Sequence, residues 1–116
     1  VIGSNPFKTH KGLYADIKAN HFGPLLKFEL KDFNNKADKS LVGKFASVPD
    51  AQGYYVLNLP STAFMFVDLA DGHQTQFRIR FKLDDDNDLT DDYVQFFSSN
   101  GPLAKCPQLV VTYTTP

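Results

Sequence analysis

Hydrophobic and polar positions alternate most strictly over residues 76–83. The apolar positions are Phe77, Ile79, Phe81 and Leu83, and the residues between them are glutamine, arginine or lysine. A period of two places successive side chains on opposite faces of a β-strand, whereas a helix would mix the two sets. The pattern predicts a half-buried strand. Burial of each apolar side chain contributes about 1.5–3 kcal/mol, so we expect this strand at the centre of the core.

Shorter apolar segments, separated by turn-forming residues, predict further strands. The expected strands cover residues 13–17, 25–33, 41–45, 54–59, 76–83, 93–97 and 108–114. Residues 61–68 predict a short helix capped by Ser61, and a fully buried strand is the alternative for the same residues. Residues 1–12 are rich in turn formers and predict a loop.

Many short strands with frequent turns are typical of antiparallel sandwiches and jelly rolls, and no strand–helix–strand spacing is present. The 116 residues, with 11 Phe and 5 Tyr, are enough for one core. We therefore expect an all-β fold in a single domain over residues 1–116. Its form would be an antiparallel β-sandwich or jelly roll with at most one short helix near residues 61–68.

The charge is close to balanced in total but uneven along the chain. A net charge of −1 argues against a nucleic-acid partner, and no apolar run is long enough for membrane insertion. Residues 84–92 hold six of the thirteen acidic residues, which leaves seven against twelve lysines and arginines elsewhere. That basic excess is either ordinary surface lysine or a face for an anionic polymer. Cys106 is the single cysteine, so no internal disulfide is expected.

The aspartate-rich segment 84–92 gives the strongest hint of site chemistry, because carboxylate oxygens in a flexible loop favour Ca²⁺. The candidate metal ligands are Asp84, Asp86 and Asp88 at alternate positions, with Asp91 or Asp92 closing the set. The EF-hand pattern fails, since Leu89 stands where that loop requires glycine. The alternative is a solvated acidic turn that pairs with basic side chains of the preceding strand.

Arginine and tyrosine side chains are the candidates for ligand binding. Arg78 and Arg80 share one face of the expected strand and can grip a carboxylate or uronate with forked guanidinium groups. The alternative is structural pairing with aspartates of a neighbouring strand or of the loop. Aromatic faces stack on sugar rings, which makes Tyr14, Tyr54 and Tyr93 candidates for a sugar platform.

The sequence offers little support for catalysis. Glu29 is the single glutamate and lies among lysines, and the three histidines lack metal-ligand spacing. No glycine-rich phosphate loop and no nucleophile-elbow motif occurs. We therefore expect a protein that is not an enzyme.

Most of the chain resembles a known family, and the likeness is best from Gln74 onward. Residues 74–81, the Asp/Asn loop after them, residues 92–98 and residues 107–113 resemble the C-terminal half of the disaggregatase-related (DNRLRE-type) domains. Phe22–Gly23, Leu30 and Asp32–Phe33 also resemble positions of that family. Its members are extracellular β-sandwich modules that are often grouped with carbohydrate-binding modules.

The resemblance implies an extracellular or cell-surface location and non-catalytic binding of a polysaccharide, which the charge distribution suggests is acidic. We therefore expect a carbohydrate-binding or adhesive module, stabilised by Ca²⁺ at residues 84–92. The family's N-terminal strands have no counterpart here, so we expect a sandwich that lacks part of a longer domain. An open sheet edge can accept a strand from a neighbouring chain. The alternative function is therefore a self-associating structural subunit of an extracellular filament or surface layer.

Overall fold

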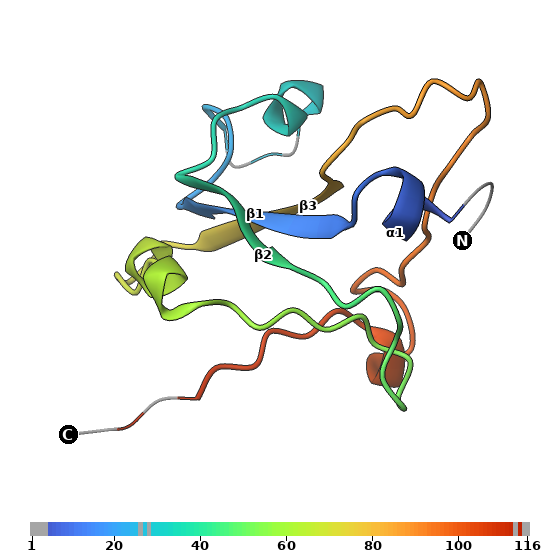
Figure 1. Cartoon of the computed structure of the whole chain (residues 1–116). Coiled ribbons are helices and arrows are strands. Elements are labelled where there is room, and N and C mark those ends of the chain that lie inside the picture. Colours follow the sequence, from blue (N-terminus) through green and yellow to red (C-terminus); the bar gives the residue numbers. More distant parts are fainter. Residues whose placement is uncertain (1–4, 26, 28, 113, 115–116) are drawn as a thin grey trace.

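A three-stranded antiparallel sheet forms the centre of the molecule (Figure 1). The computed structural model describes residues 5–25, 27, 29–112 and 114. The strands are β1 (Leu13–Ala19), β2 (Lys39–Lys44) and β3 (Thr75–Phe81), in the order β2-β1-β3. The strands predicted at residues 13–17, 41–45 and 76–83 are thus confirmed, with ends that differ by a few residues. The fold is mostly β, with few and short helices.

Short helices are more frequent than the sequence pattern suggested. The expectation of at most one helix is wrong, since the described residues contain α1 (Pro6–Thr9), η1 (Leu30–Phe33), η2 (Ser61–Phe66) and η3 (Leu103–Lys105), of which the η elements are 3₁₀ helices. The helix expected near residues 61–68 is confirmed as η2, but its N-cap is Pro60 and no side chain caps it.

Helix α1 lies in the segment that we predicted to be loop. The Asn5 side chain accepts a hydrogen bond from the Phe7 N–H at 3.1 Å, and Pro6 occupies the first helical turn. Asparagine at the cap with proline directly after it is a helix-start signal, and it outweighs the high content of turn formers. Residues 1–4 of the predicted loop lie outside the described residues.

The strand predicted over residues 25–33 is wrong for its second half, which forms η1. The Glu29 N–H donates to Asp32 Oδ2 at 2.8 Å, and the Asp32 N–H donates to the Glu29 carbonyl at 2.9 Å. The first bond is part of a capping box between Glu29 and Asp32, and the second closes the 3₁₀ turn. Such local bonds offer the backbone an alternative to sheet pairing. Residues 26 and 28, which carry part of the alternation, lie outside the described residues.

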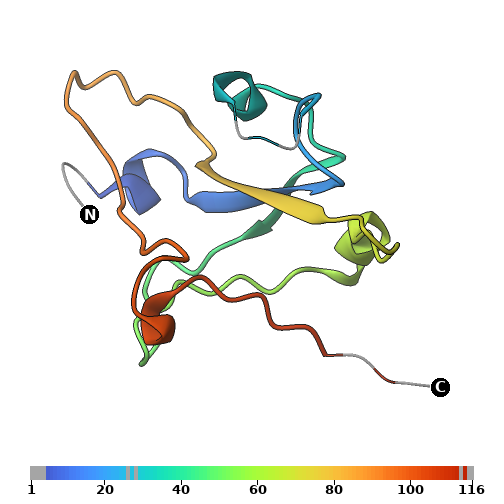
Figure 2. The ribbon, with the colours of Figure 1, turned by 180° about the vertical axis from the view of Figure 1, so that it is seen from behind.

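The strands predicted at residues 54–59, 93–97 and 108–114 are also not found as regular strands. The described residues there are extended, with an isolated bridge at Tyr93, and residue 113 lies outside the described part. Alternation shows only which side chains prefer to be buried. A regular strand also needs a neighbouring backbone that forms hydrogen bonds to it in register. Residues 50–58 and the C-terminal segment run side by side in Figures 1 and 2, joined by side-chain bonds.

The core lies on one face of the sheet, beneath β1 and β2 and against η2. Its buried residues are Ala15, Ile17, Val42 and Ala63. Ile17 is fully buried, whereas Phe77 is only partly buried and Ile79 is 51% exposed. The expectation that the segment 76–83 is the centre of the core is therefore wrong. β1 takes that place because it has a neighbour on each side, whereas β3 is an edge strand.

No helix within the described residues is long and apolar enough to cross a bilayer.

Candidate functional site

The second face of the sheet carries the charged side chains that the sequence singled out. In the antiparallel register, Asp16 of β1 is opposite Arg78 of β3, and Tyr14 is opposite Arg80. Alternate residues of a strand share a face, so these four side chains lie on the face opposite to Ala15 and Ile17. The carboxylate and both guanidinium groups therefore meet above the middle of the sheet.

Asp16 is fully buried, and hydrogen bonds satisfy both of its carboxylate oxygens. Oδ2 accepts from Arg78 Nη2 at 2.6 Å, from Arg78 Nε at 3.0 Å and from Arg80 Nε at 2.8 Å. Oδ1 accepts from the Leu41 N–H at 2.7 Å, at an irregularity in the β1–β2 pairing. One carboxylate thus links the two edge strands through the central strand.

The ionisation of Asp16 follows from these contacts. Burial raises the pKa of Asp16, but hydrogen bonds from Arg80, the Leu41 N–H and Arg78 together lower it more. The pKa therefore lies below its ordinary value, and the carboxylate is ionised at neutral pH.

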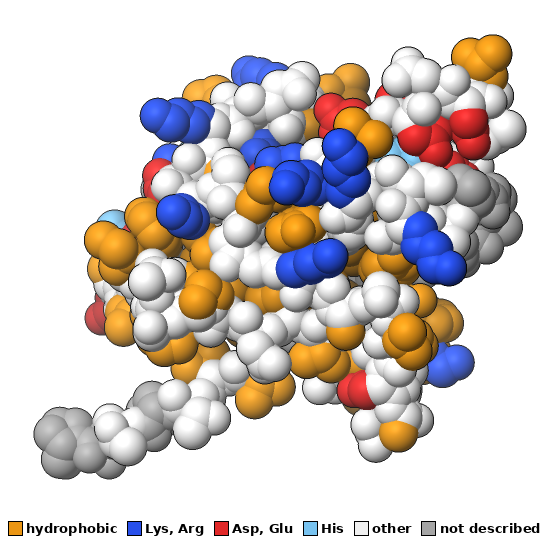
Figure 3. All heavy atoms as spheres, viewed as in Figure 1, with side chains coloured by type: hydrophobic (Ala, Val, Ile, Leu, Met, Phe, Trp, Pro, Cys, Tyr) orange, Lys and Arg blue, Asp and Glu red, His pale blue; other side chains and the backbone are white. Residues whose placement is uncertain are grey.

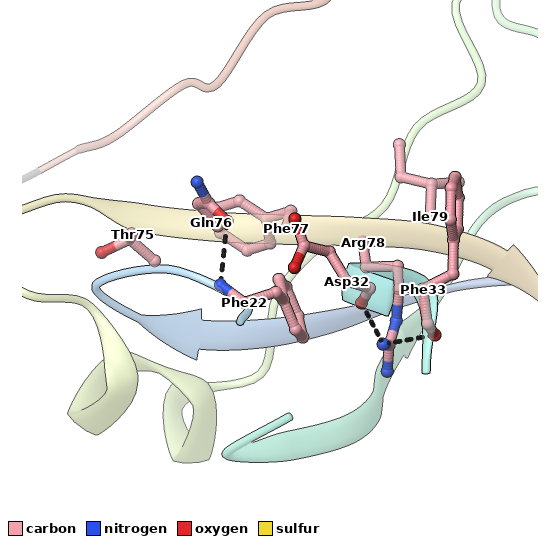
Figure 4. Close-up of a pocket in the computed structure, with 8 residues that line it drawn as sticks. All are labelled: Phe22, Asp32, Phe33, Thr75, Gln76, Phe77, Arg78 and Ile79. Carbon is pink, nitrogen blue, oxygen red and sulfur yellow. Dashed lines mark hydrogen bonds between the residues drawn. The ribbon is translucent and has the colours of Figure 1, made fainter. Parts of the chain in front are cut away.

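Arg78 fastens a long loop to the sheet (Figure 4). Its Nη1 donates to the carbonyl oxygens of Asp32 at 3.1 Å, Phe33 at 2.7 Å and Asn35 at 2.8 Å. Its guanidinium carbon lies 4.6 Å from the centre of the Phe22 ring. Arg78 thus makes the structural pairing that the sequence left open, and its donors are used within the chain rather than facing a ligand.

Arg80 is placed differently, with about a third of its side chain exposed. It donates to Asp16 through Nε and makes a long bond of 3.4 Å to the Phe81 carbonyl. Beside it, Tyr14 is half-buried, and Lys44 Nζ lies 5.9 Å from the centre of the Tyr14 ring. Tyr14 therefore has a cationic side chain on each neighbouring strand. We call Tyr14, Lys44 and Arg80 the cationic face.

Two predicted ligand-binding residues lie in other segments. The Tyr54 hydroxyl donates to the Ala104 carbonyl at 2.7 Å and accepts from Gln108 Nε2 at 3.1 Å, so it joins its segment to the C-terminal one. Tyr93 lies at the isolated bridge after the acidic loop and is 42% exposed. The structure thus brings together Tyr14, Arg78 and Arg80. It adds Lys44, which the sequence did not single out because only strand register places it there.

The acidic loop stabilises its own turns. Carboxylates of Asp85, Asp86 and Asp88 accept from backbone N–H groups two residues later, at 2.7, 3.2 and 2.8 Å. The Thr90 hydroxyl also donates to Asp88 Oδ1 at 2.6 Å. These two bonds from Thr90 are the main cause of the lowered pKa of Asp88. Such local bonds are typical of aspartate in turns and need no metal.

Two of the five predicted metal ligands meet in space, together with a histidine. Ligand atoms of His10, Asp86 and Asp92 all lie within 4.8 Å of one another. Asp84, Asp88 and Asp91 are not part of any such three-residue group among the described residues. His10 was not predicted as a metal ligand, because nothing in the sequence shows that the end of α1 lies beside residues 84–92. Ca²⁺ binding by the predicted aspartate set stays a prediction.

Comparisons of the chain with family models, with curated proteins and with solved structures found no match. The likeness to the disaggregatase-related domains therefore stays a prediction from the sequence.

Proposed function

We propose that this chain is a non-catalytic extracellular module that binds an acidic polysaccharide through the cationic face. The observation that carries the proposal is the position of Tyr14 between Lys44 on β2 and Arg80 on β3. A uronate ring combines an apolar face with a carboxylate. An exposed part of a tyrosine ring suits the apolar face, and the two cations suit the carboxylate.

The charge count supports an anionic ligand. Arg78 and Arg80 carry two positive charges and both pair with the single negative charge of Asp16. Lys44 adds a third positive charge beside Tyr14. The group as a whole therefore keeps an excess of positive charge. In Figure 3, lysine and arginine side chains are spread over the middle of the molecule, and acidic side chains gather at the upper right, where Figure 1 draws the 84–92 loop. That separation favours a ligand with repeated negative charges.

The finer parts of the proposal come from the sequence. The extracellular location follows from the likeness to the disaggregatase-related domains. We also propose the sandwich architecture, with the extended segments near residues 54–59 and 108–112 as the layer that faces the sheet. Leu57 and Leu59 of the first segment pack against the core, and Figures 1 and 2 show the C-terminal segment running beside that segment.

Affinity electrophoresis in native gels tests the proposal, with alginate or pectate as the acidic polymer and dextran as the neutral reference. We expect the acidic polymers to retard the chain, and dextran to leave its mobility unchanged. Lys44→Ala should weaken binding about 2–5-fold, the loss of a contact worth about 0.5–1 kcal/mol. Lys44 is exposed, so the fold should persist.

A matched control is Lys105→Ala. Lys105 Nζ lies 5.0 Å from the centre of the Phe97 ring, so this variant removes a lysine–aromatic contact elsewhere in the chain. We expect it to bind like the wild type. Equal retardation of the Lys44→Ala and wild-type chains, or no retardation by any acidic polymer, would disprove the proposal. Retardation should also weaken as salt increases, because exposed charges are screened.

A second candidate function is that of a self-associating structural subunit, and the edge strand β3 favours it. Ile79 on β3 is 51% exposed and lines a shallow groove of about 530 Å³ along the strand (Figure 4). Exposed apolar residues also occur in the C-terminal half, among them Phe96, Phe97 and Leu109. Such an edge can pair with an extended segment of another chain. Sedimentation over a wide concentration range decides, since a monomer throughout would exclude this function.

A further inference from the structure

The turn at residues 98–101 contains the single Asn–Gly pair of the chain. Asn100 is exposed and lies outside the helices and strands of the fold. Among the described residues, its side-chain amide has no hydrogen-bond partner, since the one bond of Asn100 comes from its backbone N–H. The amide is therefore unconstrained beside the backbone nitrogen of Gly101, which has no Cβ to shield that nitrogen.

This arrangement permits a reaction within the chain itself. The Gly101 nitrogen attacks the side-chain carbonyl carbon of Asn100 and closes a five-membered ring. The new N–C bond replaces the bond to the side-chain nitrogen, which leaves as ammonia. Water then opens the ring. Opening at the side-chain carbonyl gives aspartate, and opening at the main-chain carbonyl gives isoaspartate, in which the backbone runs through the former side chain. No atom is oxidised or reduced.

The hydrogen bonds of the turn can open without disruption of the sheet. The Gly101 N–H donates to the Ser98 carbonyl at 3.0 Å, and the Asn100 N–H makes a long bond of 3.3 Å to the Ser98 hydroxyl. Both bonds belong to one exposed turn, and such segments open locally at a small cost in free energy. The attack therefore does not require unfolding of the chain.

Packing requires a small residue at position 101. A Cβ on Gly101 would lie 3.1 Å from Phe97 Cδ1 and 3.2 Å from the Ser98 carbonyl oxygen, which is closer than ordinary van der Waals contact. The fold thus favours at this position the residue that leaves the neighbouring asparagine most reactive.

The same turn holds the thiol of Cys106. Its Sγ donates to the carbonyl oxygens of Gly101 at 3.2 Å and Pro102 at 3.4 Å. The next residues form η3, which the Tyr54 hydroxyl joins to residues 50–58. An isoaspartate adds a carbon atom to the backbone directly before Gly101, so it displaces the carbonyl groups that surround the thiol.

We propose that Asn100–Gly101 is a site of spontaneous deamidation, and that its isoaspartate product frees the Cys106 thiol from the turn. The co-reactant is water, and each product adds one negative charge to the net charge of −1. The site does not depend on the cationic face or on its ligand.

Incubation of the purified chain at pH 9 and at pH 6 tests the proposal. Peptide mapping with electron-transfer fragmentation distinguishes isoaspartate from aspartate at residue 100. We expect both products, with ¹⁸O taken up from H₂¹⁸O, and faster conversion at pH 9 because the attacking nitrogen must lose its proton. In the converted chain, Cys106 should react faster with an aromatic disulfide reagent than in the fresh chain.

Two variants separate the chemistry from its structural consequence. Asn100→Gln keeps the amide but needs a six-membered ring, so conversion should be about tenfold slower, which is about 1.4 kcal/mol of barrier. Freshly purified Asn100→Asp carries the added charge without the added backbone atom, so its thiol should react as in the fresh wild type.

The same samples contain internal controls. Asn34 and Asn87 are also exposed, but each precedes a residue with a side chain, and both should stay amides under the same conditions. An unconverted Asn100 at pH 9, equal conversion at Asn34 or Asn87, or an unchanged Cys106 reaction rate in the converted chain would each overturn the proposal.

Discussion

Asp16 and the 84–92 loop both present carboxylates, but the hydrogen-bond donors to Asp16 are distant in sequence, whereas those in the loop are two residues away. Asp16 accepts from Leu41, Arg78 and Arg80, which are far from it in sequence and lie on both neighbouring strands. In the loop, the bonds to Asp85, Asp86 and Asp88 come from groups two residues away. The Asp16 bonds hold the tertiary structure together, whereas the loop bonds shape single turns and leave carboxylate oxygens for other contacts.

Removal of the Asp16 carboxylate should have the largest effect. Asp16→Ala leaves Arg78 and Arg80 without their shared anion, and loss of one partner of a buried ion pair costs about 3–5 kcal/mol. Urea unfolding measures the free energy of unfolding. The matched variant is Asp85→Ala, which removes a loop carboxylate whose one hydrogen bond among the described residues comes from the Asn87 N–H. Equal destabilisation by the two variants would remove the distinction between the regions.

Arg78→Lys should have the next largest effect, because lysine cannot reach Asp16 and the loop carbonyls at once. We expect a loss of about 1–3 kcal/mol, since the buried Asp16 carboxylate and partly buried loop carbonyls lose their donor. Amide hydrogen exchange should become faster for residues 29–35, which Arg78 fastens to β3. Arg80→Lys is the control and should cost less, because Arg80 is partly exposed. A larger loss for Arg80→Lys would contradict the assignment of Arg78 as the structural arginine.

Acidification should have a smaller effect, because protonated Asp16 keeps its oxygen atoms in place. The pKa of Asp16 is lowered in the folded chain, so its contribution to the free energy of unfolding is complete above the unfolded-state value of about 3.9. It is lost as the pH falls through the lower folded-state pKa. Urea midpoints measured from pH 6 to pH 2 should therefore converge for the wild type and Asp16→Asn. Parallel curves at all pH values would show that Asp16 does not titrate as the structure indicates.

Residue patterns along the chain were enough to predict the strands with strict alternation and the carboxylate-rich loop. The alternation over residues 76–83 predicted β3, and the six aspartates of the loop predicted a carboxylate-rich turn. Both signals are local, since period-two alternation and aspartate-to-backbone bonds involve residues close in the chain. The same local reasoning missed α1 and η1, where side-chain caps redirected the backbone.

Tertiary structure alone decided which side chains meet. Strand register set Arg78 against Asp16 and Lys44 beside Tyr14, and the packing of α1 placed His10 beneath the loop. It also decided that β1, rather than β3, is the centre of the core. A side chain's partners depend on which backbones become neighbours, and alternation along one strand carries no information about the strand beside it.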